Sequence, residues 1–115
     1  MKKVFLLAVV SLLVGCKNEP EIPDYVLSEE KMVQLLIDFR LAEGKVNGLN
    51  MPSDSARGLM RYLESRILDE HEVDSMDYLK SYEYYMLNSQ QYLRINDIVI
   101  DSLKVRLQRV TSNSK

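Results

Sequence analysis

Residues 88–110, NSQQYLRINDIVIDSLKVRLQRV, carry the clearest helical pattern in the chain. Apolar residues recur there every three or four positions, which is the spacing of one face of an α-helix. Asn88 and Gln91 form a pair like those that cap helix starts, and 111–115 is a polar tail expected to fray. The predicted helix therefore covers 88–110, and its apolar face consists of Tyr92, Ile95, Val99, Leu103, Leu107 and Val110.

Three further helices are indicated upstream by the same periodicity and by polar start signals. Ser28 and Asp74 can each cap a helix, and Ser53 or Asp54 opens another between them. The predicted helices cover residues 28–46, 53–67 and 75–87, and no segment alternates apolar and polar residues as a half-buried strand would. We therefore predict an all-α domain over 28–110, a small bundle of three to four helices with antiparallel neighbours.

The first fifteen residues have the three parts of a secretory signal. Lys2 and Lys3 precede an apolar run over residues 4–14, and a small residue follows. The run is much shorter than the roughly 20 residues of a membrane-spanning helix. Leu13-Val14-Gly15-Cys16 matches the signature at which lipoproteins are acylated and cut. We predict a lipoprotein signal peptide over 1–15 and an acylated Cys16; the alternative is an ordinary signal peptide with an incidental cysteine.

The predicted lipid also indicates how the chain is held. Cys16 is the only cysteine, and a thiol is the side chain suited to thioether formation near neutral pH. Two or more acyl chains, such as palmitate, give stable anchoring in a bilayer. Residues 16–27, with Pro20 and Pro23 among polar residues, predict an extended tether. Lys17 stands where an Asp would favour inner-membrane retention, so we expect the outer membrane, with the domain in the periplasm or at the cell surface.

Composition excludes one class of partner. Removing residues 1–15 takes two Lys from 15 basic residues, leaving 13 basic against 17 acidic and a net charge of −4. A nucleic-acid surface needs an excess of basic side chains, so we expect no nucleic-acid partner. The remaining residues suffice for one small domain.

The sequence offers no convincing catalytic or metal site. Its only histidine, His71, lies in the acidic run over residues 69–72. Neighbours this close cannot all converge on one ion, and no second His or Cys completes a transition-metal shell. Neither a glycine-flanked nucleophile turn nor a Gly-rich phosphate loop is present. We expect no catalytic residue, no metal and no cofactor apart from the lipid on Cys16.

Five tyrosines lie between residues 78 and 92. Such a group could pack in the core or form a stacking platform for a peptide or glycan. Tyr84 falls on the charged side of the helix over 75–87, so we expect it to be an exposed contact residue. The predicted core face of that helix carries Tyr78, Tyr82, Tyr85, Leu79 and Met86.

Glu43 interrupts the apolar arc of the first predicted helix. A buried carboxylate requires partners, and Arg40, three residues earlier, or Asn96 on the last helix could supply them. Two outcomes remain open. Glu43, Arg40 and Asn96 form a buried polar network that fixes helix register, or the helix frays at Gly44 and Glu43 reaches water.

Ile98 and Val105 lie seven residues apart on the last helix, away from its main apolar face. Arg94 and Asp101 accompany them. Two apolar residues in that position indicate either a second buried face or a contact site for a partner protein.

A set of apolar, aromatic and polar positions between residues 23 and 107 resembles a known family. They are Lys31, Met32, Leu36, Asp38, Leu41, Ala42, Glu43, Tyr78, Ser81, Tyr84, Tyr85, Asn88 and Val99. The pattern is similar to that of a short lipoprotein family of Bacteroidetes-type envelopes, catalogued as domain of unknown function 4296. The resemblance implies an envelope address and this architecture but no activity.

The expected function is that of a membrane-anchored, non-catalytic interaction or accessory module acting on another envelope protein. The alternative is a module that binds a peptide or glycan through the tyrosine-rich helix over 75–87.

Overall fold

The computed structural model describes residues 22–114, and these form helices without any strand. The helices are α2 (Glu29–Gly48), α3 (Ser53–Glu70), α4 (Ser75–Leu87) and α5 (Ser89–Asn113). The predicted all-α fold is confirmed. The predicted signal peptide, Cys16 and residues 17–21 of the predicted tether lie outside the described residues. The rest of that tether, 22–27, packs against the bundle, where Val26 is buried.

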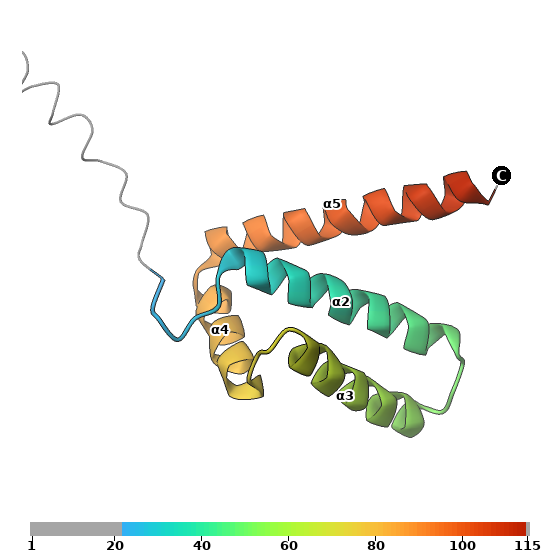
Figure 1. Ribbon diagram of the computed structural model, residues 1–115, viewed down its shortest axis with the longest axis horizontal. Coiled ribbons are helices and arrows are strands. Elements are labelled where there is room, and N and C mark those ends of the chain that lie inside the picture. The colour runs from blue at the N-terminus through green and yellow to red at the C-terminus, as the bar shows by residue number, and fades with distance from the viewer. Residues whose placement is uncertain (1–21, 115) are drawn as a thin grey trace, which may run out of the picture.

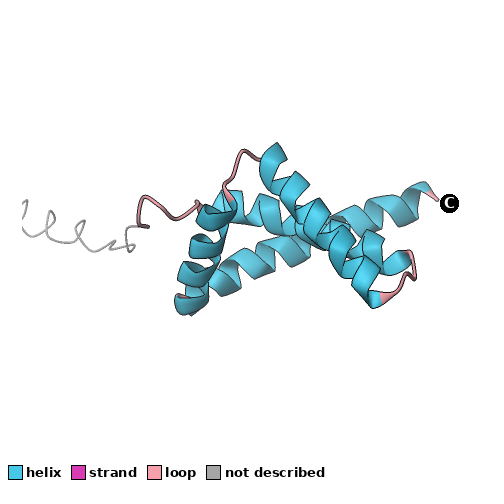
Figure 2. Ribbon diagram, turned by 90° about the horizontal axis from the view of Figure 1, so that it is seen from below, coloured by secondary structure: helices cyan, strands magenta, loops and turns pink. Residues whose placement is uncertain are grey.

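Helix α2 is the central element of the bundle. Figure 1 shows α3 returning antiparallel along one side of α2 and α5 running along the other, and α2 packs against both. Helix α4 crosses one end of these three helices, as the second view also shows (Figure 2). The prediction of antiparallel neighbours therefore holds for α2 and α3. It is wrong for α4 and α5, which meet at a corner.

Two helices begin at the predicted caps. The Ser28 hydroxyl accepts a hydrogen bond from the Lys31 amide at 3.1 Å, and the Asp74 carboxylate accepts one from the Met76 amide at 3.4 Å. Helix α3 begins after Pro52 without a side-chain cap. Proline suits the boundary because its fixed φ matches the first turn and it has no N–H to satisfy.

The predicted cap at Asn88 is wrong. Its Nδ2 donates to the backbone carbonyl of Tyr84 at 2.7 Å, so Asn88 closes the end of α4 and does not cap α5. Oε1 of Gln91 is buried without a hydrogen-bond partner among the described residues. Helix α5 also outlasts its predicted end and continues to Asn113.

The core follows from the central place of α2, which is covered on two sides. Toward α4 and α5, Met32 and Ile37 pack with Tyr85, Ile95 and Val99. Toward α3, a smaller cluster joins Leu35, Leu68 and Val73. A single apolar stripe predicts that a helix packs on one side only, whereas α2 is packed on two sides.

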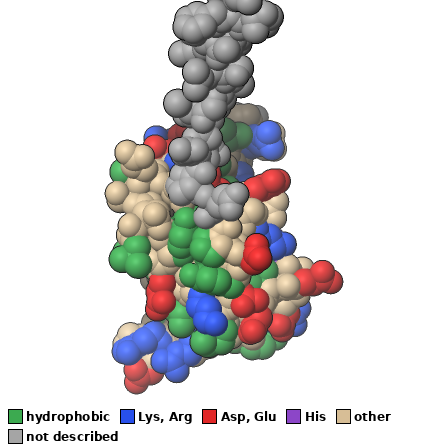
Figure 3. Space-filling model, turned by 90° about the vertical axis from the view of Figure 1, so that its left-hand side faces the viewer, with side chains coloured by type: hydrophobic (Ala, Val, Ile, Leu, Met, Phe, Trp, Pro, Cys, Tyr) green, Lys and Arg blue, Asp and Glu red, His purple; other side chains and the backbone are tan. Residues whose placement is uncertain are grey.

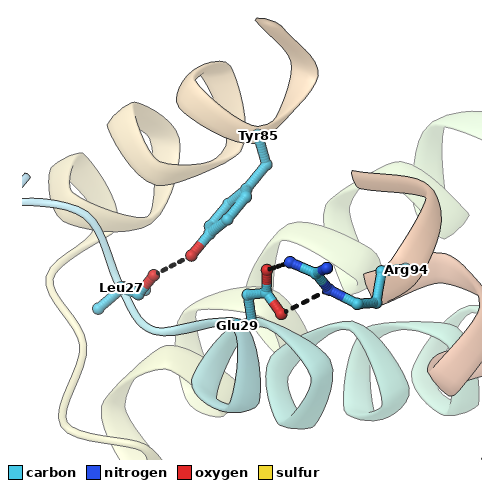
Figure 4. A network of polar contacts seen from close by, with 4 residues as sticks. All are labelled: Leu27, Glu29, Tyr85 and Arg94. Atoms are coloured by element: carbon cyan, nitrogen blue, oxygen red, sulfur yellow. Dashed lines mark hydrogen bonds and ion pairs between the residues drawn. The ribbon is translucent and has the colours of Figure 1, made fainter. Parts of the chain in front are cut away.

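Side chains of α4 and α5 hold the segment that leads into α2 (Figure 4). The Tyr85 hydroxyl donates to the Leu27 carbonyl at 2.6 Å, and the Leu27 amide donates to Ser81 Oγ at 2.9 Å. Arg94 binds the Glu29 carboxylate through two nitrogens, at 2.6 and 3.1 Å. Residues 54 to 65 positions apart are thereby joined, and the start of α2 is fixed against the α4–α5 corner.

Candidate functional site

One hollow of the bundle is a cleft of about 230 Å³ lined by residues of all four helices. Its lining comprises Leu36, Phe39, Arg40, Glu43, Met60, Glu64, Tyr78, Tyr82, Tyr92, Asn96 and Val99. We call it the tyrosine cleft. It forms because α4 crosses the ends of α2 and α5 and brings its tyrosines to the space beside α2.

Four aromatic rings form a continuous row in this cleft. Phe39 meets Tyr78 edge-on at 5.2 Å, Tyr78 lies 6.2 Å from Tyr82, and Tyr82 meets Tyr92 edge-on at 6.3 Å. These separations suit attractive aromatic pairs. The row connects α2 with α4 and α5, which lie much later in the sequence.

The hydroxyls of the row have perturbed acidities. Burial raises the pKa of Tyr78 to about 12. A hydrogen bond with Tyr92 raises the pKa of Tyr82. Hydrogen bonds from Asn96 and Tyr82 lower the pKa of Tyr92. The hydroxyls of Tyr78 and Tyr82 thus stay protonated at neutral pH, and the cleft can bind a guest by ring contact and hydrogen bonding.

Glu43 and Arg40 lie at this cleft as a surface ion pair. Arg40 Nη1 lies 3.1 Å from Glu43 Oε2, but their side chains are 57% and 52% exposed. Of the two outcomes left open, the buried network is therefore wrong and Glu43 reaches water, while Arg40 is its partner as expected. Glu43 falls on the part of α2 between the two covered faces, and the helix remains intact through Gly44. An exposed pair of this kind contributes at most about 1 kcal/mol.

Asn96 belongs to the same cleft but not to that pair. Its side chain hydrogen-bonds Tyr92. The three residues predicted as one network, Glu43, Arg40 and Asn96, thus line one cleft as two separate polar contacts.

The expectation of an exposed Tyr84 is wrong, because its ring is half-buried and meets Tyr85 edge-on at 5.2 Å. The segment before α2 packs against the core cluster that Tyr84 also contacts, and helical periodicity within 75–87 could not foresee that cover. Two further predictions for α4 are wrong, because Leu79 and Met86, which were expected in the core, are exposed. Tyr85 is the buried anchor of α4.

His71 joins two helices through a carboxylate. Its Nε2 lies 2.6 Å from Asp38 Oδ2, which ties the end of α3 to the middle of α2. Within residues 22–114 no group of His, Cys, Asp and Glu side chains has the arrangement of a metal site. Sequence reasoning missed this contact because the two residues are 33 positions apart.

Ile98 and Val105 are exposed on α5, at 44% and 45% of their surface. The predicted possibility of a second buried face is thus wrong within one chain, because α2 and not α5 is the central helix. The possibility of a contact site stays a prediction.

The outer half of α5 exposes the continuation of its core stripe. Ile95 and Val99 are 1% and 4% exposed, whereas Leu107 and Val110, on the same face, are 65% and 66% exposed. Figure 1 shows α5 diverging from α2 toward the C-terminus. Leu93 and Ile100 add to the exposed apolar surface. We call Leu93, Ile100, Leu107 and Val110 the exposed surface of α5; Ile98 and Val105 lie on the opposite side of the helix.

A second apolar area covers the outside of α4. Figure 3 shows apolar side chains among charged ones on the end of the molecule where α4 lies. The exposed apolar residues of this helix are Met76, Leu79, Met86 and Leu87. None of the helices in the described part of the chain is both long and apolar enough to span a bilayer.

The fold and its site define a small all-α domain with an aromatic cleft and an exposed apolar helix. The chain belongs to the family described as "Domain of unknown function (DUF4296)", whose model matches residues 23–109. The resemblance found in the sequence is thereby confirmed at the level of the family. No curated protein and no solved structure gave a match.

Proposed function

We propose that the chain is a lipid-anchored envelope protein whose helical domain is a non-catalytic interaction module. The anchor rests on Leu13-Val14-Gly15-Cys16 and the apolar run before it. The outer membrane is the proposed address, on the evidence of Lys17. The anchor would hold the domain near the bilayer by the short segment that precedes residue 22.

The observation that carries the interaction role is the exposed surface of α5. A small soluble domain gains stability by covering its apolar side chains, and a contiguous exposed set marks a contact site. Here the stripe that is buried at Ile95 and Val99 continues uncovered to Leu107 and Val110. The surface is thus available to a partner without rearrangement of the core.

Two variants of the full chain test the two parts of this proposal separately. Cys16→Ser should abolish acylation and move the protein out of the membrane fraction. Leu107→Asp should leave fractionation and thermal stability unchanged but abolish crosslinking to its partner in intact envelopes. A Cys16→Ser protein that fractionates like the parent contradicts the anchor, and a Leu107→Asp protein that still crosslinks contradicts the contact site.

The tyrosine cleft favours a second candidate function, the binding of a peptide or glycan. Ring faces, protonated hydroxyls and the Arg40–Glu43 pair all border its 230 Å³. Titration with short peptides and oligosaccharides, followed by NMR of labelled tyrosines, tests this function. Signals of Tyr78, Tyr82 and Tyr92 should shift, whereas Tyr62, exposed on α3 away from the cleft, should not. Equal shifts at all four rings would rule out a specific site.

A further inference from the structure

The exposed surface of α5 is part of a regular heptad pattern. Leu93, Ile100 and Leu107 are spaced by seven residues, and Asn96, Leu103 and Val110 follow each of them by three. This is the a and d spacing with which one helix meets another in a coiled coil. We call these six positions the α5 seam. Its a positions are exposed at 60%, 49% and 65% of their surface.

The seam is largely separate from the face that α5 turns to its own core. Ile95 and Val99 make that core contact, whereas Leu93, Ile100 and Leu107 lie further round the helix. Leu103 and Asn96 border both, since Leu103 is half-buried against the core cluster and Asn96 lines the tyrosine cleft. A second helix can therefore lie along the seam while α5 stays packed on α2.

Flanking charges select how two such seams would pair. Asp97 and Lys104 occupy successive positions next to d, and both are exposed without an ion-pair partner among residues 22–114. In an antiparallel pair of α5 helices, Asp97 of each copy lies opposite Lys104 of the other, which gives two ion pairs. A parallel pair would set Lys104 against Val99 and Arg106 against Thr111, with no opposite charges facing.

We propose that the partner of the exposed surface of α5 is a second copy of this chain, paired antiparallel along the α5 seam. Leu93 then meets Val110 of the partner subunit, and Ile100 meets Leu103 of the partner subunit. Both copies use the same residues, as a two-fold interface requires. This inference rests on the proposed interaction module and names its partner.

The length of the seam sets the strength of the pairing. Residues 93–110 offer fewer than the roughly three to four heptads of a free-standing coiled coil. The pair is therefore weak in dilute solution. Confinement of both copies to one membrane surface raises their effective concentration and favours pairing.

Crosslinking in intact envelopes tests the pairing in the full chain. The double variant Leu93→Cys with Val110→Cys, treated with a short bis-maleimide, should give a dimer. Each single variant should give several-fold less, because the two copies of one residue would lie about 25 Å apart along an antiparallel pair. Ile98→Cys with Val105→Cys is the matched control. It has the same register on the opposite side of α5, and should give none.

A charge exchange in the double-cysteine background tests the direction of pairing. Asp97→Lys should reduce the dimer several-fold, and Asp97→Lys with Lys104→Asp should restore it. All these side chains are exposed, so the variants should melt like the parent, which thermal unfolding checks.

Several results would overturn the inference. Equal crosslinking by the single variants would indicate a parallel pair. The absence of a dimer from the double variant would contradict pairing along the seam. A dimer that does not return when Asp97→Lys is combined with Lys104→Asp would contradict the antiparallel direction. A crosslinked product containing a different protein would also overturn it, yet would leave the proposed interaction module standing. Loss of that module would appear instead as no crosslink to any protein.

Discussion

Leu27 shows how single polar atoms hold this small bundle together. Both of its backbone polar groups are bound by α4, the carbonyl by Tyr85 and the amide by Ser81. Tyr85 and Ser81 are almost fully buried, at 1% and 0% exposure. Removing either hydroxyl would therefore leave a Leu27 backbone group without a hydrogen-bond partner and without water to replace that partner.

Tyr85→Phe therefore tests how much one hydroxyl contributes to the stability of the fold. The ring remains, but the Leu27 carbonyl loses its donor, and the free energy of unfolding should fall by about 1–3 kcal/mol. Chemical denaturation measures the difference. Tyr62→Phe is the control because its hydroxyl is exposed and makes only a 3.5 Å contact with Arg66. Equal losses for the two variants would contradict a special role for Tyr85.

Among the elements, the end of α3 stores local strain. Glu72 has a left-handed φ of 57°, while its amide bonds the Asp69 carbonyl at 3.1 Å and the Val73 amide bonds the Leu68 carbonyl at 2.9 Å. These two bonds form the Schellman closure of a helix, in which glycine usually takes the left-handed position. Leu68 and Val73 also pack together, so the closure is tied to the core.

Glu72→Gly should consequently stabilise the domain. It relieves a left-handed conformation that costs a residue with a Cβ roughly 1–2 kcal/mol, less the extra freedom glycine gains on unfolding. The net gain should be about 1 kcal/mol in urea denaturation. Asn50→Gly, at a φ of 51°, should gain less because asparagine tolerates this region. A loss of stability in Glu72→Gly would show that its carboxylate has a role the strain argument omits.

For the whole molecule, the buried tyrosines lower the stability of the fold at alkaline pH. Burial raises the pKa of both Tyr78 and Tyr85 to about 12, from an ordinary value of 10.0. Below pH 10 both rings are protonated in the folded and unfolded chains, so they add no pH dependence. Between pH 10 and about 12 the unfolded chain loses these protons first, and stability falls as the pH rises.

Urea midpoints at pH 8, 9, 10 and 11 measure this fall. The parent should lose stability above pH 10, and a Tyr78→Phe variant should lose less because it has no hydroxyl to ionise there. Tyr25→Phe is a suitable control, since Tyr25 is 56% exposed. Identical slopes for the parent and Tyr78→Phe would contradict the role of Tyr78.

The helices themselves could be predicted because their signals are local. Apolar spacing, Ser28 and Asp74 as caps, and the short polar connections all act within a few residues, and each of the four helices lies close to its predicted place. The resemblance to the family was likewise legible from positions along the chain. Of the candidate site, the Arg40–Glu43 contact could be foreseen because the two residues are one helical turn apart.

Burial and the cleft depended on contacts between distant residues. Sequence periodicity gives each helix a face but does not say which helix takes the centre. Because α2 takes it, Ile37 is buried, whereas Ile98 and Leu107 remain exposed. The crossing of α4 likewise sets Tyr78 beside Phe39 and exposes Leu79, since an orientation between helices is fixed by packing over long separations.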